Sequence, residues 1–217
     1  MNTSVKIAGV TFKNPVITAS GTFGFGKEYS EFYPLSALGG ICTKGLTIEE
    51  RQGNPSPRVA ETPSGMLNSV GLQNPGVDYY LERYDKWLSE QGTVVIANIA
   101  GHKLEDYSAM ARKISQSRAD MVELNISCPN VRSGGMAFGV EPASVRRVTE
   151  AVKRACDKPV ITKLTPNVSN IADNARAAED GGADAISLIN TLTGMAVDHR
   201  TRRPILANNT GGLSGPC

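Results

Sequence analysis

The stretch that decides the fold is Glu123-Leu124-Asn125-Ile126-Ser127-Cys128-Pro129-Asn130. It completes a predicted buried strand, Met121–Asn125, and ends that strand abruptly in a polar turn. Pro129 fixes its own φ and drives Cys128 towards an extended conformation. A thiol held at the carboxyl end of a strand stands where an α/β enzyme places a catalytic group. The alternative is a buried, inert cysteine; the two flanking asparagines favour the catalytic interpretation, because their amides suit a planar ligand with amide groups.

The overall composition predicts an ordinary globular protein. The chain has 217 residues, 40% of them hydrophobic and 20% charged, with a net charge of +2. Nothing in this balance indicates nucleic acid or a membrane as a partner, and no apolar run is long enough to span a membrane. The N-terminus lacks the charged-then-apolar order of a signal peptide. The four cysteines (Cys42, Cys128, Cys156 and Cys217) are widely spaced and, with two histidines, form no zinc pattern, so we expect free thiols in a reducing cytoplasm.

Short apolar segments alternate with amphipathic ones along the chain. The predicted strands are 16–19, 40–43, 94–99, 121–125, 160–164 and 185–189, after an opening hairpin at 5–12. The predicted helices are 28–38, 77–90, 104–117, 142–156 and 171–179, and a long loop with little periodicity covers 47–75. This alternation predicts parallel strands joined by helical crossovers.

Two α/β architectures fit this alternation. A (β/α)₈ TIM-type barrel fits better than an open doubly wound sheet, because polar residues recur at the carboxyl ends of nearly all the strands, and those ends converge in a barrel. Such a barrel typically needs ~250 residues. We therefore expect one domain over residues 1–217, an incomplete barrel of about six strand–helix units that lacks its last two strands.

The strand ends predict a binding site made of lysines, amides, hydroxyls and a thiol. Its expected members are Ser20, Lys44, Asn98, Asn125, Cys128, Asn130, Lys163, Asn190 and Thr191, with Asn68 from the long loop. This set suits an anionic heterocycle with several amide groups and a substrate that bears a carboxylate. It contains no carboxylate pair and no metal-ligand cluster, which argues against glycoside hydrolysis and metal-assisted hydrolysis.

The role of Lys163 has three interpretations. It could extend to the solvent at the rim, form a Schiff base as in aldolases of this fold, or stabilise charge on a bound cofactor. The neighbouring thiol and amides favour the cofactor role, although spacing alone leaves the Schiff base open. Lys44 is likewise either a site residue or a surface charge.

Four motifs in order along the chain resemble class 1 dihydroorotate dehydrogenases. They are residues 19–24 (ASGTFG), 68–76 (NSVGLQNPG), 123–130 (ELNISCPN) and 211–215 (GGLSG). Gly24-Phe25-Gly26 and Val131-Arg132-Ser133-Gly134-Gly135 are similar to the NAD-linked class 1B catalytic subunit. The thiol also argues against class 2 enzymes, which use a serine base.

The resemblance implies a barrel that holds FMN and oxidises (S)-dihydroorotate to orotate in pyrimidine biosynthesis. Cys128 would remove a proton from C5 while a hydride leaves C6 for the flavin, and Lys163 would stabilise the reduced flavin. Substrate contacts would come from Lys44, Asn68, Ser69, Val70, Gly71, Leu72, Asn125, Asn130, Asn190 and Thr191. The FMN site would be lined by Ser20, Lys44, Gly45, Asn98, Asn125, Lys163, Ile189 and Gly215. The loop 131–139 would be a lid.

The resemblance also implies partners. Electrons would pass to a subunit that carries FAD and a [2Fe–2S] cluster and reduces NAD⁺, with a homodimer inside a heterotetramer. The family's last two strands, which grip the FMN phosphate, are expected to be missing here. Three alternatives stay open: an inactive truncated remnant, a flavoenzyme like dihydropyrimidine dehydrogenase, and a lyase or aldolase that uses Lys163 as a Schiff base.

Overall fold

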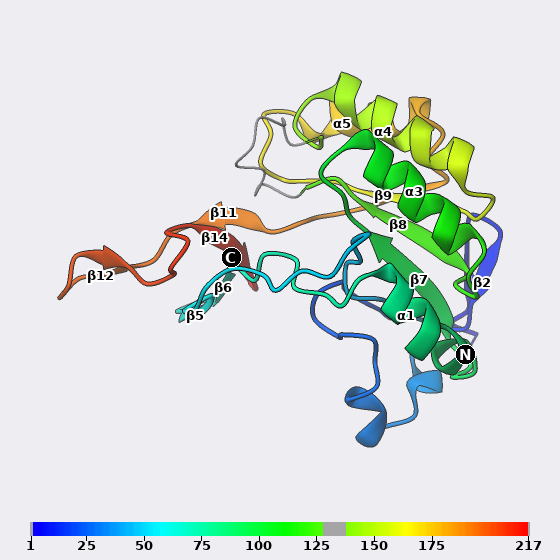
Figure 1. Ribbon diagram of the computed structural model, residues 1–217, viewed down its shortest axis with the longest axis horizontal. Coiled ribbons are helices and arrows are strands. Elements are labelled where there is room, and N and C mark those ends of the chain that lie inside the picture. Colours follow the sequence, from blue (N-terminus) through cyan, green and yellow to red (C-terminus); the bar gives the residue numbers. More distant parts are fainter. Residues whose placement is uncertain (1, 128–137, 217) are drawn as a thin grey trace.

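The computed structural model, which describes residues 2–127 and 138–216, is built around a six-stranded parallel sheet (Figure 1). Its strand order is β10-β9-β8-β7-β4-β3. The bounds are β3 Ile17–Thr18, β4 Gly40–Cys42, β7 Val94–Ile99, β8 Met121–Asn125, β9 Val160–Lys163 and β10 Ala185–Ser187. All neighbouring strands pair in parallel, so the predicted α/β incomplete barrel is confirmed.

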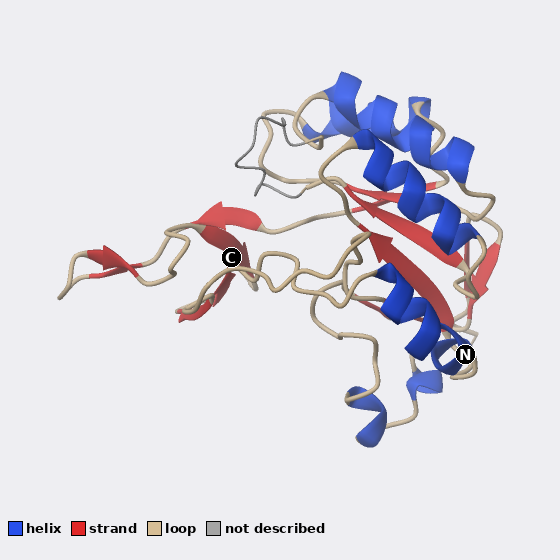
Figure 2. Cartoon of the chain, in the orientation of Figure 1, coloured by secondary structure: helices blue, strands red, loops and turns tan. Residues whose placement is uncertain are grey.

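The helices cover one face of this sheet (Figure 2). They are α1 Val77–Arg83, α2 Asp85–Ser89, α3 Leu104–Ser115, α4 Pro142–Ala155 and α5 Ile171–Asp180. Helix α4 begins with Pro142, which has no backbone N–H that would lack a partner in the first turn. The helix buries Val145, Val148 and Val152 at helical spacing. Helix α5 begins after Asn170, whose side chain accepts a hydrogen bond from the Ala172 N–H over 3.1 Å.

Successive side chains along each strand point to opposite faces of the sheet. The outer face is apolar, whereas the inner face changes from apolar to polar along the strands. Outward residues such as Val122 and Leu124 join the core formed with the helices. Inward residues near the amino ends, including Ile96 and Met121, pack against Phe12 in a second apolar cluster. Phe12 belongs to the predicted opening hairpin, formed by β1 Val5–Ile7 and β2 Val10–Phe12. Further along the strands the inner face becomes polar.

A second, four-stranded sheet lies beyond the carboxyl ends of the parallel strands (Figure 1). Its order is β11-β14-β6-β5, with bounds β11 Leu192–Gly194, β14 Gly211–Ser214, β6 Gly65–Asn68 and β5 Val59–Thr62. Its members come from two distant parts of the chain. An arm made of β12 Val197–Asp198 and β13 Arg203–Pro204 extends away from the body.

Two predicted helices were wrong in detail. In place of a helix over 28–38 there are two single 3₁₀ turns, Tyr29–Glu31 and Leu35–Ala37, because Pro34 between them adopts an extended conformation with ψ 125°. In place of one helix over 77–90, α1 and α2 are separated at Tyr84, whose φ of −118° lies outside the helical range.

Two predicted irregular segments contain strands. The loop 47–75 includes the β5–β6 hairpin, which pairs in four registered positions from Val59↔Asn68 to Thr62↔Gly65. The glycine-rich motif at 211–215, where no strand was predicted, contains strand β14. Strand β6 also pairs with β14, a segment far away in sequence, and local composition does not reveal such a pairing.

Candidate functional site

A buried carboxylate organises the polar end of the inner face. Glu123 Oε1 accepts hydrogen bonds from Asn98 Nδ2 at 2.7 Å and from the Cys42 thiol at 3.1 Å, and Oε2 accepts one from Ser187 Oγ at 2.9 Å. Lys163 Nζ lies 3.9 Å from Oε1. The Glu123 and Lys163 side chains are 8% and 14% exposed, so the ion pair is largely removed from solvent. We call these five residues the Glu123 network.

The network follows from the strand register. Asn98 on β7 pairs with Glu123 on β8, and both side chains point to the inner face. On the other side of β8, Lys163 pairs with Asn125, one inward position beyond Glu123. Glu123 was not among the predicted site residues. The available signal was a single carboxylate inside an otherwise apolar strand segment, because such a group is rarely buried unless it has partners.

The thiol in the network is a hydrogen-bond donor. Burial, and secondly the charge of Glu123, raise the pKa of Cys42 well above its ordinary value. The group therefore stays protonated at neutral pH and donates to the carboxylate. Cys42 is 2% exposed, so it is a structural thiol in the floor of the site.

Asn98 leaves one polar atom without a partner. Its Oδ1 is buried and has no hydrogen bond among the described residues. A Cβ added to Gly45 would stand 2.8 Å from this oxygen and 3.4 Å from Leu72 Cδ2. A side chain at Gly45 would therefore crowd this unpaired acceptor. Buried acceptors without partners are uncommon, and one at a candidate site suits a donor group on a ligand.

The loops after β3 and β4 bring Ser20 and Lys44 to the same end of the sheet. Ser20 Oγ donates to the Thr43 carbonyl over 2.7 Å, and Thr43 Oγ1 accepts from the Asn98 N–H over 3.1 Å. The Lys44 N–H donates to Gly24 O over 2.8 Å. The predicted residues Ser20, Lys44 and Asn98 are thus connected through Thr43.

A second group of predicted residues meets around Asn125. Its Oδ1 accepts from Asn190 Nδ2 and from the Ser127 N–H, each over 3.2 Å. Asn190 Oδ1 in turn accepts from the Thr191 N–H over 2.8 Å. Ser127 Oγ also donates to the Lys163 carbonyl over 3.4 Å, so the end of β8 is attached to β9.

The second sheet brings the Asn68 segment to the same region. Asn68 Nδ2 donates to the Gly212 carbonyl over 3.3 Å, and the Thr191 side chain lies against Gly212. Ser69 is buried, and its N–H donates to Arg58 O over 2.7 Å. Gly71 and Leu72 both have a positive φ, 76° and 55°, which bends the chain after β6.

The remaining predicted site residues fall in three places. Cys128, Asn130 and residues 131–137 of the predicted lid lie outside the described residues. Ile189 follows β10 and is 47% exposed. Gly215 follows β14 and approaches Gly65, where an added Cβ would stand 2.7 Å from the Gly65 Cα. The structure therefore places Gly215 beside the β5–β6 hairpin.

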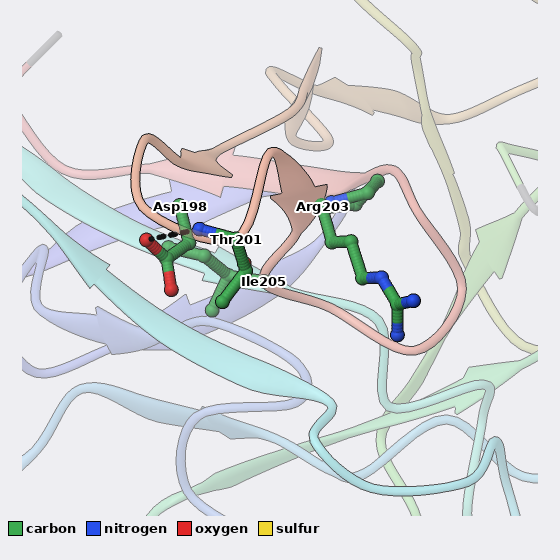
Figure 3. Close-up of a pocket in the computed structure, with 5 residues that line it drawn as sticks. Asp198, Thr201, Arg203 and Ile205 are labelled. Atoms are coloured by element: carbon green, nitrogen blue, oxygen red, sulfur yellow. Dashed lines mark hydrogen bonds between the residues drawn. The ribbon is translucent and has the colours of Figure 1, made fainter.

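A pocket on the arm is separate from this site (Figure 3). It is lined by Asp198, Thr201, Arg203, Pro204 and Ile205. Asp198 Oδ1 accepts from the Arg200 N–H over 2.8 Å, and this bond lowers the pKa of the Asp198 carboxyl. These contacts lie within the arm itself, and none of the predicted site residues takes part. The pocket is therefore a feature of the hairpin turn.

The described ranges hold neither a metal-ligand cluster nor a membrane-spanning helix. Residues 2–127 and 138–216 contain no group of three or more His, Cys, Asp or Glu that could hold a metal ion. In the same ranges no helix has the length and apolar character needed to cross a membrane.

Comparison with known proteins gives one consistent match. The family model described as "Dihydroorotate dehydrogenase" matches residues 2–217. The chain is 56% identical over 216 residues to "Dihydroorotate dehydrogenase B (NAD(+)), catalytic subunit" of Alkaliphilus metalliredigens (strain QYMF), covering 100% of this chain and 72% of that protein. It is 55% identical over 217 residues to the protein of the same name from Oceanobacillus iheyensis, covering 100% of this chain and 71% of that protein.

A solved structure supports the fold. The "Crystal structure of DHODH in complex with ferulenol from Eimeria tenella" aligns with a TM-score of 0.75 at 21% identity. The alignment covers 99% of this chain and 65% of that chain. At this identity the likeness concerns the fold alone.

Proposed function

The chain belongs to the dihydroorotate dehydrogenase family, and from this membership we propose that it oxidises (S)-dihydroorotate to orotate with FMN, as the catalytic part of an NAD-linked enzyme. The observation that carries the proposal is the family match over residues 2–217, together with 56% identity to a curated catalytic subunit. We also propose that residues 1–217 form one FMN-binding domain.

The described residues fit the isoalloxazine ring of FMN. The unpaired acceptor Asn98 Oδ1, which faces no side chain at Gly45, suits a flat heterocycle that has an N–H donor. Lys163 supplies a cation in a wall largely removed from solvent, where charge stabilisation is strong. Ser20, Lys44 and Asn125 complete the proposed contacts, with Ile189 and Gly215 at the edges of the proposed site. Bound FMN would supply the acceptor for the hydride from C6 of dihydroorotate.

The proton at C5 needs a base, and we assign this role to Cys128. The assignment rests on the family motif. The preceding residue, Ser127, is held in place by two hydrogen bonds: its hydroxyl donates to the Lys163 carbonyl and its N–H donates to Asn125 Oδ1. A thiol has an ordinary pKa near ~8.5, so the site must lower it or couple its ionisation to hydride loss.

The pyrimidine ring would be held by amides and its carboxylate by a cation. Asn125, Asn190 and Thr191 form one connected polar group, which suits the ring amides of dihydroorotate. Lys44 is the proposed partner of the carboxylate. The segment 68–72 and Asn130 are proposed as further contacts.

The proposal of a second subunit is supported by the name of the relatives and by the cysteines among the described residues. An iron–sulfur cluster needs four suitably placed ligands, and over residues 2–127 and 138–216 the free cysteines Cys42 and Cys156 are buried in separate parts of the core. The relatives are named as a catalytic subunit linked to NAD⁺. We propose that a partner carrying FAD and a [2Fe–2S] cluster takes the electrons and reduces NAD⁺, with a dimer of this chain at the centre.

The test is anaerobic titration. The purified chain is mixed with FMN, and dihydroorotate is added while the flavin absorbance is followed. We expect dihydroorotate to bleach the flavin in the wild-type chain and in Cys156→Ser but not in Cys128→Ser. Cys156→Ser is the control, because Cys156 lies in the core between the sheet and the helices. Dihydrouracil, which lacks the carboxylate, should bleach the flavin poorly if Lys44 binds the carboxylate of dihydroorotate.

Three outcomes contradict parts of the proposal. Failure to bind FMN would reject the flavin site in this chain and favour an inactive remnant. Equal bleaching by dihydrouracil would reject the carboxylate contact. Borohydride trapping of a carbonyl substrate on Lys163 would support the Schiff-base alternative.

A further inference from the structure

The carboxylate of Glu123 determines which end of the Asn98 amide faces Gly45. A carboxamide has one donor group and one acceptor atom, whereas a carboxylate can only accept. Because Nδ2 of Asn98 donates to Glu123 over 2.7 Å, Oδ1 must point the other way. That atom is the buried oxygen beside Gly45 that has no described partner.

The same carboxylate also sets the charge next to the site. Glu123 Oε1 lies 3.9 Å from Lys163 Nζ, and both side chains are under 15% exposed. Charges at this separation interact strongly when little solvent screens them. Glu123 therefore holds the ammonium group in place and offsets part of its positive charge.

The Glu123 network has one acceptor without a partner among the described residues. Glu123 receives donors from β4, β7 and β10, yet the amide that it fixes ends in an unpaired oxygen. Buried polar groups in folded proteins almost always have partners. An N–H group on a bound ligand would supply one.

We propose that Glu123 is a positioning residue, which orients Asn98 and restrains Lys163. The floor of the site then offers one acceptor and one partly neutralised cation to a flat heterocycle with an imide N–H. This inference rests on the proposed function, in which that heterocycle is the flavin ring. Glu123 itself touches Asn98, Cys42, Ser187 and Lys163 and acts through the first and last of these.

Two variants separate the two roles. Glu123→Gln keeps the size and an acceptor but removes the charge, so Asn98 should keep its orientation while the cation at Lys163 is no longer offset. Glu123→Met removes the acceptor, so the Asn98 amide is free to turn. Thr149→Val is the matched control, because it deletes a buried hydrogen bond to Thr162 on the opposite face of β9.

Flavin readouts give specific expectations. Glu123→Met should raise the Kd for FMN at least tenfold, whereas Glu123→Gln should change it by less than about threefold. Glu123→Gln should favour the reduced, negatively charged flavin by about tenfold, a shift of about 30 mV to more positive potential for a two-electron couple. Thr149→Val should change neither quantity. Unchanged values in both Glu123 variants would overturn the proposal.

A second readout needs no flavin. The side-chain amide signals of Asn98 in an NMR spectrum, assigned by their loss in Asn98→Asp, should move clearly in Glu123→Met and little in Thr149→Val. Unmoved signals would reject the orienting role. If the wild-type chain binds no FMN, the proposed function fails, and this spectrum still decides whether Glu123 orients Asn98.

Discussion

Thr191 lies so close to Gly212 that only a glycine fits there. A Cβ at position 212 would stand 1.9 Å from Thr191 Oγ1 and 2.6 Å from its Cβ. Gly212 also pairs with Asn68 and accepts a hydrogen bond from its side chain. The contact therefore joins the segment after β10 to the second sheet and involves two predicted site residues, Asn68 and Thr191.

Substituting Gly212 by alanine should disrupt this contact. Overpacking of this kind typically costs ~1–3 kcal/mol of stability, and here it should also weaken substrate binding. Chemical denaturation gives the first quantity and titration with orotate the second. Gly194→Ala is the control, because its Cβ meets the flexible end of Leu67 at 3.0 Å. Adding Thr191→Gly should recover part of the stability; full additivity of the two changes would show that the contact is unimportant.

Substituting Gly45 by alanine should weaken flavin binding. The new methyl group would enter the space beside Asn98 Oδ1, at 2.8 Å from that atom. We expect at least a tenfold higher Kd for FMN, measured by fluorescence quenching. Gly101→Ala has an equally close contact, 2.8 Å from Asp106 Cβ, but on the side of helix α3. If both variants lost FMN affinity equally, the effect would come from general steric crowding and not from the contact with Asn98.

The buried thiol of Cys42 should make the protein sensitive to alkaline pH. Its pKa is raised in the folded state, mainly by burial, so the folded protein holds this proton more tightly than the unfolded chain. The contribution of this proton to stability is complete below the ordinary pKa of a thiol and declines as pH rises above it, by about 1.4 kcal/mol per pH unit. Urea unfolding between about pH 8 and 11 should show a steeper decline in wild type than in Cys42→Ala. Parallel declines would contradict the assignment.

The Asp184 carboxylate should contribute more to the free energy of unfolding than its ion-pair partner Lys153 does. Asp184 Oδ2 accepts from the Val160 N–H and from Lys153 Nζ, each over 2.7 Å. Removing the carboxylate leaves the first N–H of β9 without its partner, which costs ~1–3 kcal/mol. The ion pair alone contributes ~0–1 kcal/mol, because both side chains are partly exposed. Thermal unfolding of Asp184→Ala and Lys153→Met should therefore differ clearly, and similar melting temperatures would reject this ranking.

The parallel sheet could be predicted because its signal is local. Each strand is a short apolar segment between helices, and Val94–Ile99 and Met121–Asn125 have the predicted bounds. The strand-end residues could be predicted for the same reason, since parallel strands bring their carboxyl ends to one edge. Their chemical roles stay predictions, and for Cys128 and Asn130 the positions lie outside the described residues.

The second sheet and Glu123 could not be predicted, because both depend on distant partners. Asn68 and Gly212 are 144 residues apart, and neither segment has a clear strand pattern alone. Glu123 is buried because Cys42, Asn98 and Ser187 supply three donors from three other strands. The sequence around a buried carboxylate does not say where such donors come from.

The Glu123 network draws one side chain from each of five neighbouring strands, β4, β7, β8, β9 and β10. Residues that share one network do not contribute independently to stability. The mutational effects at these five positions should therefore be epistatic: a substitution tolerated with one set of partners becomes harmful with another. Over evolutionary time, changes at these five positions should therefore tend to occur together, and a designer who alters one should test compensating changes at the others.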